Sequence, residues 1–302
     1  MHSSLVIMAA GLGSRYGGSK QVDGIGPNGE ILMEYSIHDA LRAGFDKVVF
    51  IIKPEMQEMM DGLVGYLKQK KTADGRPVEV AFVYQDFTSV PSFYRIPEER
   101  TKPFGTVHAL LCAEPAVDGP FCVINADDYY GVDVYRTIYE ELGKLAPSGE
   151  STMVGYLLKN TASLHGTVSR GVCKVKDGKL DSIQETLKIQ LYPDGHLTDL
   201  DTGTELDPET VVSMNFWGFS PMLFEEIEKQ FIEFYHKNSE NPKAEIYIPF
   251  VVDELIKQKA VKVKVLNTSA QWFGVTYKED TELVNNALQK FDGEGLYTDM
   301  GQ

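Results

Sequence analysis

The chain has 302 residues and a mass of 33.7 kDa, which is enough to bury a large core in one or two domains. Hydrophobic residues make up 43% and charged residues 24%, an ordinary globular composition that excludes disorder as the dominant state. The 29 Lys and Arg against 44 Asp and Glu give a formal net charge of −15. With no long basic stripe, the sequence disfavours nucleic acid and anionic membrane surfaces as partners.

The sequence shows neither a disulfide pattern nor a typical signal peptide or membrane segment. Cys112, Cys122 and Cys173 are too few and too scattered for a disulfide scaffold. The apolar run 5–10 has no basic stretch before it and is short for a signal peptide. No stretch approaches the roughly 20 apolar residues of a membrane helix. We therefore expect a cytoplasmic location.

The first half alternates strands with helices. Apolar runs rich in β-branched and aromatic residues predict strands, and apolar positions at helical spacing predict helices. Such an alternation favours right-handed βαβ crossovers, and hence an α/β fold with a doubly wound, mostly parallel, Rossmann-like sheet. The expected strands are 5–9, 47–52, 78–84 and 121–125, and the expected helices are 33–43, 55–70, 106–113 and 132–145.

After residue 150 the pattern becomes rich in strands, with hairpin signals at 176–178 and 193–195. We expect a β-rich layer on the same sheet and a single domain over 1–302, with halves 1–150 and 151–302. The loop 85–104 and the acidic segment 193–210 do not fit this pattern, and the latter is a second lid or an insertion. The expected strands are 153–158, 171–175, 180–184, 189–192, 211–219 and 261–267, and the expected helices are 221–237, 246–259 and 279–290.

The sharpest motif is AAGLGSRYGGSKQ, at residues 9–21, directly after the first expected strand. Gly11 and Gly13 would let backbone N–H groups approach a phosphate, and Arg15 and Lys20 would neutralise a polyphosphate from two sides. The spacing is not that of a Walker A loop. It is also a poor dinucleotide fingerprint, because Tyr16 stands where the third glycine belongs.

Two further motifs follow expected strands. In PFGTVHAL, at 103–110, Gly105 would allow close approach to a flat base, and Thr106 would place a hydroxyl at a helix start, where it could equally be an N-cap. His108 is expected to be structural. In VINADDYY, at 123–130, Asp127 falls at the carboxyl end of a strand, where open α/β sheets bind ligands, and Asp128 could contribute through water.

These motifs, in this order, resemble the sugar-1-phosphate nucleotidyltransferases, or NDP-sugar pyrophosphorylases, which have a GT-A-like fold. The resemblance implies that the half 1–150 binds the nucleotide and the half 151–302 binds the sugar phosphate. Gln85 resembles the residue that reads a pyrimidine edge in relatives. The implied roles are catalysis for Arg15 and Lys20, nucleotide binding for Ala10, Gly11, Gly13, Gln85, Gly105 and Thr106, and Mg²⁺ binding for Asp127.

The second half carries the implied sugar-phosphate residues. Segment 183–188 resembles the family's I-x-E-K, with Glu185 on the sugar hydroxyls and Lys188, two residues later than usual, on the phosphate. In segment 214–218, Asn215 matches a sugar-binding asparagine. The match fails near the C-terminus. Relatives often carry a second metal-binding Asp or Asn after a Trp, whereas this chain has Gly274 or Thr276, followed by an acidic helix start.

The implied reaction joins an NTP, UTP or dTTP being favoured, to a sugar 1-phosphate and releases pyrophosphate, with Mg²⁺ as cofactor. Three alternatives stay open. The chain could be a cytidylyltransferase acting on phosphocholine or a similar phosphate. It could also be a catalytically silent regulatory subunit that binds sugar nucleotides, as the missing second ligand suggests. A dinucleotide-dependent oxidoreductase has only Gly11-x-Gly13 in its favour. The sequence leaves a homo-oligomer open.

Overall fold

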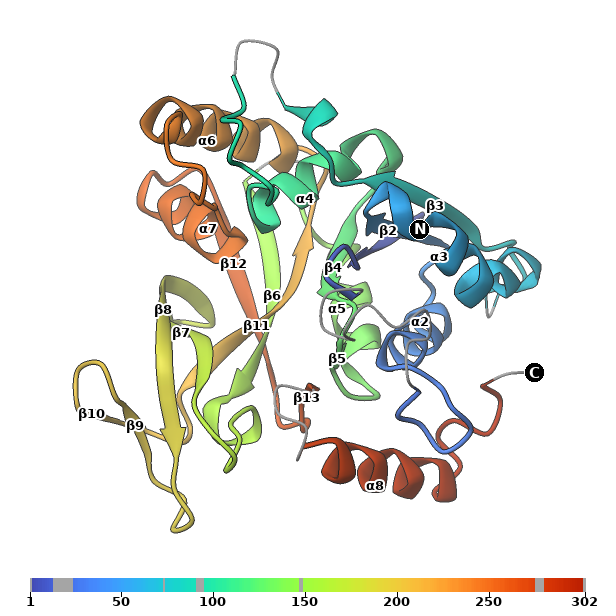
Figure 1. Cartoon of the computed structure of the whole chain (residues 1–302). Coiled ribbons are helices and arrows are strands. Elements are labelled where there is room, and N and C mark those ends of the chain that lie inside the picture. Colours follow the sequence, from blue (N-terminus) through green and yellow to red (C-terminus); the bar gives the residue numbers. More distant parts are fainter. Residues whose placement is uncertain are drawn as a thin grey trace.

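One sheet of eleven strands runs through both halves of the chain (Figure 1). The structure is a computed structural model and describes residues 2–12, 24–72, 74–90, 95–146, 149–274 and 280–300. The sheet order is β10-β9-β8-β12-β6-β11-β4-β1-β2-β3, and β7 pairs with both β11 and β8. The first-half strands β4, β1, β2 and β3 form one continuous block, which joins the second-half strands through the β11–β4 ladder.

The first half follows the expected alternation. Four strands pair in parallel. The Val- and Ile-rich strands β1, β2 and β4 are buried on both faces, as inner parallel strands require, whereas the edge strand β3 is partly exposed. The strands are β1 (Ser4–Met8), β2 (Lys47–Ile52), β3 (Glu79–Tyr84) and β4 (Phe121–Asn125). The helices are α2 (Leu32–Ala43), α3 (Gln57–Val64), α4 (Thr106–Ala113) and α5 (Val134–Leu142).

The single helix expected over 55–70 is three pieces. A 3-10 turn η1 (Pro54–Met56) precedes α3, and a second, η2 (Gly65–Gln69), follows it. Pro54 starts the first turn because its fixed φ suits a helix N-terminus. Gly65 stands where α3 gives way to the tighter turn, since glycine weakens a helix interior. Short turns η3 (Phe87–Ser89), η4 (Glu114–Ala116) and η5 (Leu158–Asn160) lie in other connections.

The expectation of a mostly parallel sheet is wrong for the second half, because hairpins connect its strands. There β12 and β6 pair in parallel, and the other ladders of the large sheet are antiparallel. The strands are β6 (Glu150–Leu157), β7 (Val168–Lys176), β8 (Lys179–Leu191), β9 (Leu197–Asp199), β10 (Thr204–Leu206), β11 (Val211–Phe219) and β12 (Lys262–Thr268). The helices are α6 (Leu223–Asn238) and α7 (Ile248–Lys257).

Two details of this half differ from expectation. The runs 180–184 and 189–192 belong to one long strand, β8, because its polar middle continues the ladder with β7. The acidic segment 193–210 contains β9 and β10, which extend the sheet at its edge. Both expected hairpins form. Asp177 and Gly178 take positive φ angles of 51° and 72°, which is the backbone that two-residue hairpin turns favour.

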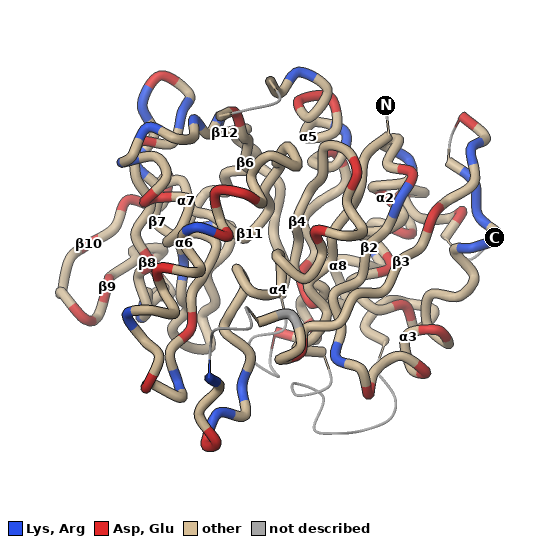
Figure 2. Tube along the Cα trace, turned by 90° about the horizontal axis from the view of Figure 1, so that it is seen from above, with Lys and Arg blue, Asp and Glu red and all other residues tan. Residues whose placement is uncertain are grey.

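Helices cover both faces of the sheet, and strand alternation supplies both cores. Side chains on one face of β1, β2 and β4 pack with α2, α3 and α5, and those on the other face pack with α4, α6 and α7. A third cluster joins α8 (Asp280–Gly293) to a two-stranded sheet of β5 (Asp128–Tyr129) and β13 (Phe273–Gly274). Lys and Arg residues and Asp and Glu residues are scattered along the whole trace (Figure 2). Among the described residues, no helix could span a membrane.

Candidate functional site

The carboxyl ends of the four parallel strands meet at one edge of the sheet, and the sequence-predicted nucleotide residues follow directly from them. Ala9 continues β1 and donates its N–H to the carbonyl of Ile51 at 2.9 Å. Gln85 continues β3 and donates its backbone N–H to Ile52 at 2.9 Å. Ala126 continues β4 and donates to Met8 at 3.3 Å. These bonds fix the first residue after each strand, so the loops start from a rigid edge.

The glycine-rich loop leaves β1 through a tight turn. Leu12 donates its N–H to the carbonyl of Ala9 at 3.1 Å, which turns the chain immediately after the strand. Ala10 is partly exposed and Gly11 exposed at this turn. A Cβ on Gly11 would meet no atom within 4 Å, so the backbone there stays open to approach. Gly13, Arg15 and Lys20 lie outside the described residues.

Gln85 and Gly105 lie 20 residues apart in sequence and contact each other directly. The Gln85 Nε2 donates to the carbonyl of Gly105 at 3.1 Å. A carbonyl can only accept, so this bond fixes the orientation of the amide and directs the nitrogen to the protein. Gln85 is 9% exposed, and its remaining polar atom, Oε1, is an acceptor.

Gly105 and Thr106 join the start of α4 to the start of α7. Gly105 has φ of +91°, and a Cβ there would overlap the carbonyl oxygen of Ile246. Gly105 is the N-cap of α4, and Thr106 is its first residue, so the expected N-cap role of Thr106 in its own helix is wrong. Its Oγ1 instead accepts from the N–H of Ile248 at 2.9 Å, at the first residue of α7.

Two neighbouring carboxylates follow β4 and differ in burial. Asp127 is partly exposed in the turn after the strand, and Asp128 is 5% exposed at the start of β5. Asp128 Oδ2 accepts from Asn125 Nδ2 at 2.7 Å and from the Tyr130 hydroxyl at 3.1 Å. The buried carboxylate is therefore held by hydrogen bonds, and the accessible one lies beside it at the sheet edge.

The C-terminal position that departs from the family pattern lies opposite this pair. In the β5–β13 ladder Gly274 pairs with Asp128, and a Cβ on Gly274 would stand 3.1 Å from Asp128 Oδ1 and overlap the Trp272 ring. The space that a side chain would need at Gly274 is thus already filled. Thr276 lies outside the described residues, and Asp280 begins α8, as expected of the acidic helix start.

The sugar-predicted residues come from β8 and β11, which both flank β7. Gly171 of β7 pairs with Glu185 on one side and with Ser213 on the other. Asn215 follows at an irregularity of β11 with φ of +60°, and its Oδ1 accepts from Trp217 Nε1 at 3.2 Å. Glu185 and Asn215 therefore lie at nearby positions across one narrow strand.

Lys188 is not brought to the same place. In the ladder with β7, strand β8 has a bulge between Thr186 and Ile189, so Lys188 does not continue the regular alternation that positions Glu185. Lys188 is exposed, and its Nζ lies 2.6 Å from the Oδ1 of Asp201 on the β9 side. Its assignment to the phosphate stays a prediction that this geometry does not favour.

The sequence interpretation missed one buried cation. Arg170 is 7% exposed, and its guanidinium lies 4.8 Å from the centre of the Trp272 ring. Burial lowers the pKa of Arg170 to about 10, and the negative charges of Asp128 and Glu185 act against this shift. Removal of water from around Glu185 raises the pKa of that carboxyl, and Arg170 partly offsets the effect. A lone arginine in a strand gives no sequence signal for such a position.

His108 has the structural role expected for it. It is fully buried, stacks on Phe231 at 5.5 Å between ring centroids, and its Nδ1 accepts from the N–H of Phe104 at 3.4 Å. Burial lowers the pKa of His108 to about 4. The ring is therefore neutral at pH 7 and supports the segment that leads into Gly105.

The chain matches one family by sequence. The family described as nucleotidyl transferase matches residues 5–275, which include the whole candidate site. No curated protein sequence matches the chain significantly.

Solved structures extend the likeness over nearly the whole fold. The UDP-glucose pyrophosphorylase complexed with UDP-glucose is 16% identical, covers 96% of this chain and 99% of its own, and has a TM-score of 0.59. A protein from Bacillus anthracis assigned as a glucose-1-phosphate thymidylyltransferase is 15% identical, covers 95% of both chains and scores 0.60. The inositol-1-phosphate CTP transferase from T. maritima is 12% identical, covers 96% and 97%, and scores 0.59. These likenesses show the fold.

Proposed function

Because the chain belongs to the nucleotidyl transferase family, we propose that it joins UTP or dTTP to a sugar 1-phosphate, giving an NDP-sugar and pyrophosphate. The observation that carries the choice of base is the orientation of Gln85. One Nε2 hydrogen is used by the Gly105 carbonyl, and the Oε1 of the oriented amide can accept from a ligand. Uracil and thymine present an N3–H donor between two carbonyls, which suits that acceptor.

The backbone around Gly105 supports a flat base at this place. Gly105 has no side chain, and its φ of +91° keeps the chain close to Ile246. Its carbonyl is occupied by Gln85, so the pair is held before any ligand binds. Two structural neighbours, a UDP-glucose pyrophosphorylase and a protein assigned as a thymidylyltransferase, agree with a uracil or thymine base.

The carboxylates at the end of β4 fit Mg²⁺. This ion commonly takes one or two protein carboxylates and completes its shell with phosphate oxygens and water. In the described part of the chain no three His, Cys, Asp or Glu side chains gather as a complete protein cage. Asp127 is the accessible carboxylate and would hold the ion, which when bound acts as a Lewis acid on phosphate oxygens.

The protein's other contributions to the reaction are to neutralise phosphate charge and to position the substrates. An oxygen of the sugar 1-phosphate attacks the α-phosphorus of the NTP, the new P–O bond forms, and the bond to the bridging oxygen breaks to release pyrophosphate. No general base is needed, because the attacking phosphate is already ionised. Arg15 and Lys20 would stabilise the phosphate charge. Glu185 and Asn215 would hold the sugar hydroxyls, which need both acceptors and donors.

The experiment is pyrophosphate release with Mg²⁺, measured for UTP, dTTP, CTP, ATP and GTP against common sugar 1-phosphates, inositol 1-phosphate and phosphocholine. We expect turnover with UTP or dTTP that EDTA abolishes. Lys20→Ala should keep the fold and lower turnover by several orders of magnitude. Lys237→Ala, an exposed lysine on α6, is the matched control and should behave as wild type. Wild-type turnover in Lys20→Ala would overturn the assignment.

A second candidate uses the same site with CTP. The inositol-1-phosphate CTP transferase shares the fold, and the amino group of cytosine could also donate to Gln85 Oε1. The aromatic cage that a quaternary ammonium would need cannot come from Tyr129 and Tyr130, because both are fully enclosed in the core. Pyrophosphate release with CTP in the same assay tests this candidate. If the folded protein binds a sugar nucleotide but releases no pyrophosphate with any pair of substrates, the result would support a regulatory subunit.

A further inference from the structure

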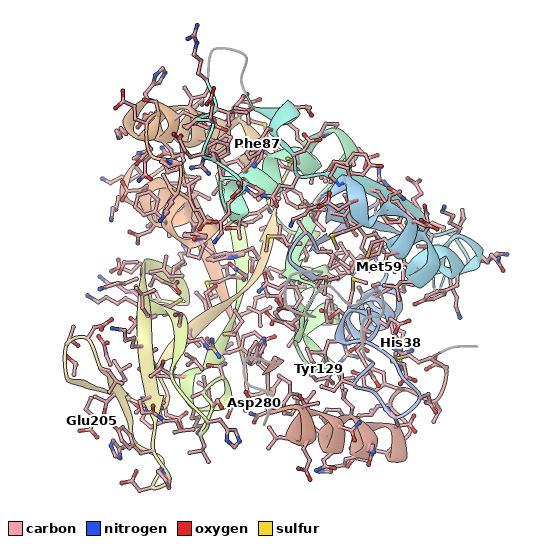
Figure 3. The ribbon with its side chains drawn as sticks, in the orientation of Figure 1. His38, Met59, Phe87, Tyr129, Glu205 and Asp280 are labelled. Atoms are coloured by element: carbon pink, nitrogen blue, oxygen red, sulfur yellow. The ribbon has the colours of Figure 1, made fainter. Side chains whose placement is uncertain are left out.

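The C-terminal segment reaches back to the strand that carries the candidate metal site. Tyr297 follows α8, is 3% exposed and belongs to the third hydrophobic cluster with Tyr35 and Tyr129. Its ring meets that of Tyr35 edge-on at 4.8 Å between centroids. Figure 3 shows Tyr129 above α8, with His38 on the neighbouring helix α2. The last turn of the chain is thus packed between α2 and β5.

A directed chain of hydrogen bonds runs through this cluster. The Tyr297 hydroxyl donates to Asp39 Oδ2 at 2.8 Å, and the Tyr129 and Tyr297 hydroxyls lie 2.8 Å apart. A hydroxyl has one hydrogen, and Tyr297 gives its own to Asp39. Tyr129 must therefore be the donor in the second bond. Asp39 is 4% exposed, so both tyrosines depend on one buried acceptor on α2.

At Asp39, this series of hydrogen bonds connects through His38 to the exposed Asp299. His38 Nε2 lies 2.9 Å from Asp299 Oδ1, and its Nδ1 lies 3.5 Å from Asp39 Oδ1. Arg42 donates to the carbonyl of Leu296 at 3.1 Å. Helix α2 therefore contacts the segment 296–299 on both sides of Tyr297 in sequence.

At its other end, the series of hydrogen bonds reaches Tyr129 in β5. Tyr129 is the residue after Asp128, and Ser36 of α2 donates its hydroxyl to the Asp128 carbonyl at 3.4 Å. On the other side of β5, Phe273 and Gly274 complete the two-stranded sheet. Strand β5 has two residues and pairs with β13 alone among the described strands, so the position of the turn that contains Asp127 also depends on the contacts of Asp128 and Tyr129 with their surroundings.

We propose that Tyr297 is a positioning residue for the metal site, acting through the hydroxyl of Tyr129 to fix the backbone at Asp127 and Asp128. The C-terminal segment is then part of the active-site framework, although no side chain of 296–300 is placed in the reaction. The metal-site part of this inference rests on the proposed function. Residues that orient metal ligands from the second layer commonly change metal affinity or activity about 10- to 100-fold when removed.

The test is Tyr297→Phe, which keeps the ring and removes the hydroxyl. We expect amide hydrogen exchange over residues 126–130 to become about tenfold faster, because Tyr129 loses its buried acceptor. The dissociation constant for Mn²⁺ alone, read by electron paramagnetic resonance, should rise about tenfold or more. In the assay, the Mg²⁺ concentration for half-maximal rate should rise, while KM for the NTP stays within about twofold.

Two control variants separate positioning from general stability. Asp39→Asn keeps an oxygen acceptor for Tyr297, so exchange over 126–130 and Mn²⁺ affinity should stay near those of wild type. Leu255→Val opens a cavity in the fully buried core around α7, away from β5, and should lower the melting temperature with unchanged Mn²⁺ affinity.

The inference is overturned if Tyr297→Phe leaves exchange over 126–130 unchanged, or accelerates exchange evenly across the chain as Leu255→Val does. The exchange measurement needs no turnover. An inactive wild-type protein would therefore contradict the proposed function, and the exchange data would still decide whether Tyr297 orders β5.

Discussion

At the scale of single residues, Gly105 carries the clearest constraint. Its positive φ and the carbonyl of Ile246 both act against a side chain. We expect Gly105→Ala to lower the free energy of unfolding by about 2 kcal/mol or more, the strain of φ and the overlap acting together. Because the Gly105 carbonyl holds Gln85, KM for the NTP should rise as well. Urea denaturation and initial rates measure the two effects.

Gly178 supplies the matched control for this prediction. It has φ of +72° in the β7–β8 turn, and a Cβ there would meet no atom within 4 Å. Gly178→Ala therefore carries the strain of positive φ without an overlap. We expect about 1 kcal/mol of destabilisation and an unchanged KM. Equal losses in the two variants would show that the contact with Ile246 has no energetic role.

His108 gives a prediction about pH. Its folded pKa of about 4 lies below its ordinary value of 6.5, so the unfolded chain binds more protons between these values. Stability is therefore full above about pH 6.5 and falls as the pH decreases toward 4. From pH 7 to pH 5 this one residue should remove about 2 kcal/mol from the free energy of unfolding.

The variant His108→Asn isolates that contribution. An asparagine oxygen can accept from the Phe104 N–H as Nδ1 does, but it does not titrate in this range. The variant should be less stable at pH 7, since it loses the stacking on Phe231, and its loss between pH 7 and pH 5 should be smaller by about 2 kcal/mol. Urea denaturation at both pH values measures this. If the variant loses as much unfolding free energy between pH 7 and pH 5 as the wild type does, His108 is not the group that titrates.

At the scale of elements, α4 and α7 share one cap. The Thr106 hydroxyl accepts from the first N–H of α7, so a residue that begins one helix satisfies a donor of another. Thr106→Val removes the hydroxyl and keeps the shape. We expect it to cost about 1 kcal/mol of stability, and Thr106→Ser to restore most of the loss. Equal melting temperatures for the valine and serine variants would contradict the shared cap.

The same contact shows what the sequence can and cannot specify. The segment around Gly105 and Thr106 predicts a helix start correctly, because the glycine and the apolar spacing are local signals. That the hydroxyl serves α7, 142 residues away, follows from packing and leaves no local trace. Lys188 is a similar case. Its segment resembles a family motif with the lysine two residues late, and in the structure its Nζ pairs with Asp201 on the β9 side.

Sheet direction is the other feature that local patterns specify poorly. Buried apolar runs predict strands in both halves, and both turn sequences predict their hairpins. The order of strands depends on contacts between distant segments, such as β12 entering between β8 and β6. Arg170 reaches the site through the same long-range arrangement, so no spacing rule could have identified it.

At the scale of the whole molecule, the continuous sheet and the hydrophobic cores shared by both halves predict one unfolding transition. Strand β4, in the first half, pairs with β11 from the second half, and β6 pairs with both β11 and β12. Separating the halves would expose the paired edges of β4 and β11, and it would divide the hydrophobic cluster that contains Val6 and Val123 from the first half and Phe219 and Phe231 from the second. We therefore expect the two halves to unfold together, although the chain is longer than most two-state proteins.

Two probes can follow this transition separately. Far-ultraviolet circular dichroism reports all helices, and tryptophan fluorescence reports Trp217 in β11 and Trp272 beside β13, both buried. In urea the two curves should coincide at one midpoint. A fragment of residues 1–150 should remain largely unfolded, because β4 would lose its partner β11 and expose apolar residues such as Val123. Two separate midpoints, or a folded fragment, would show that the halves are independent despite the shared sheet.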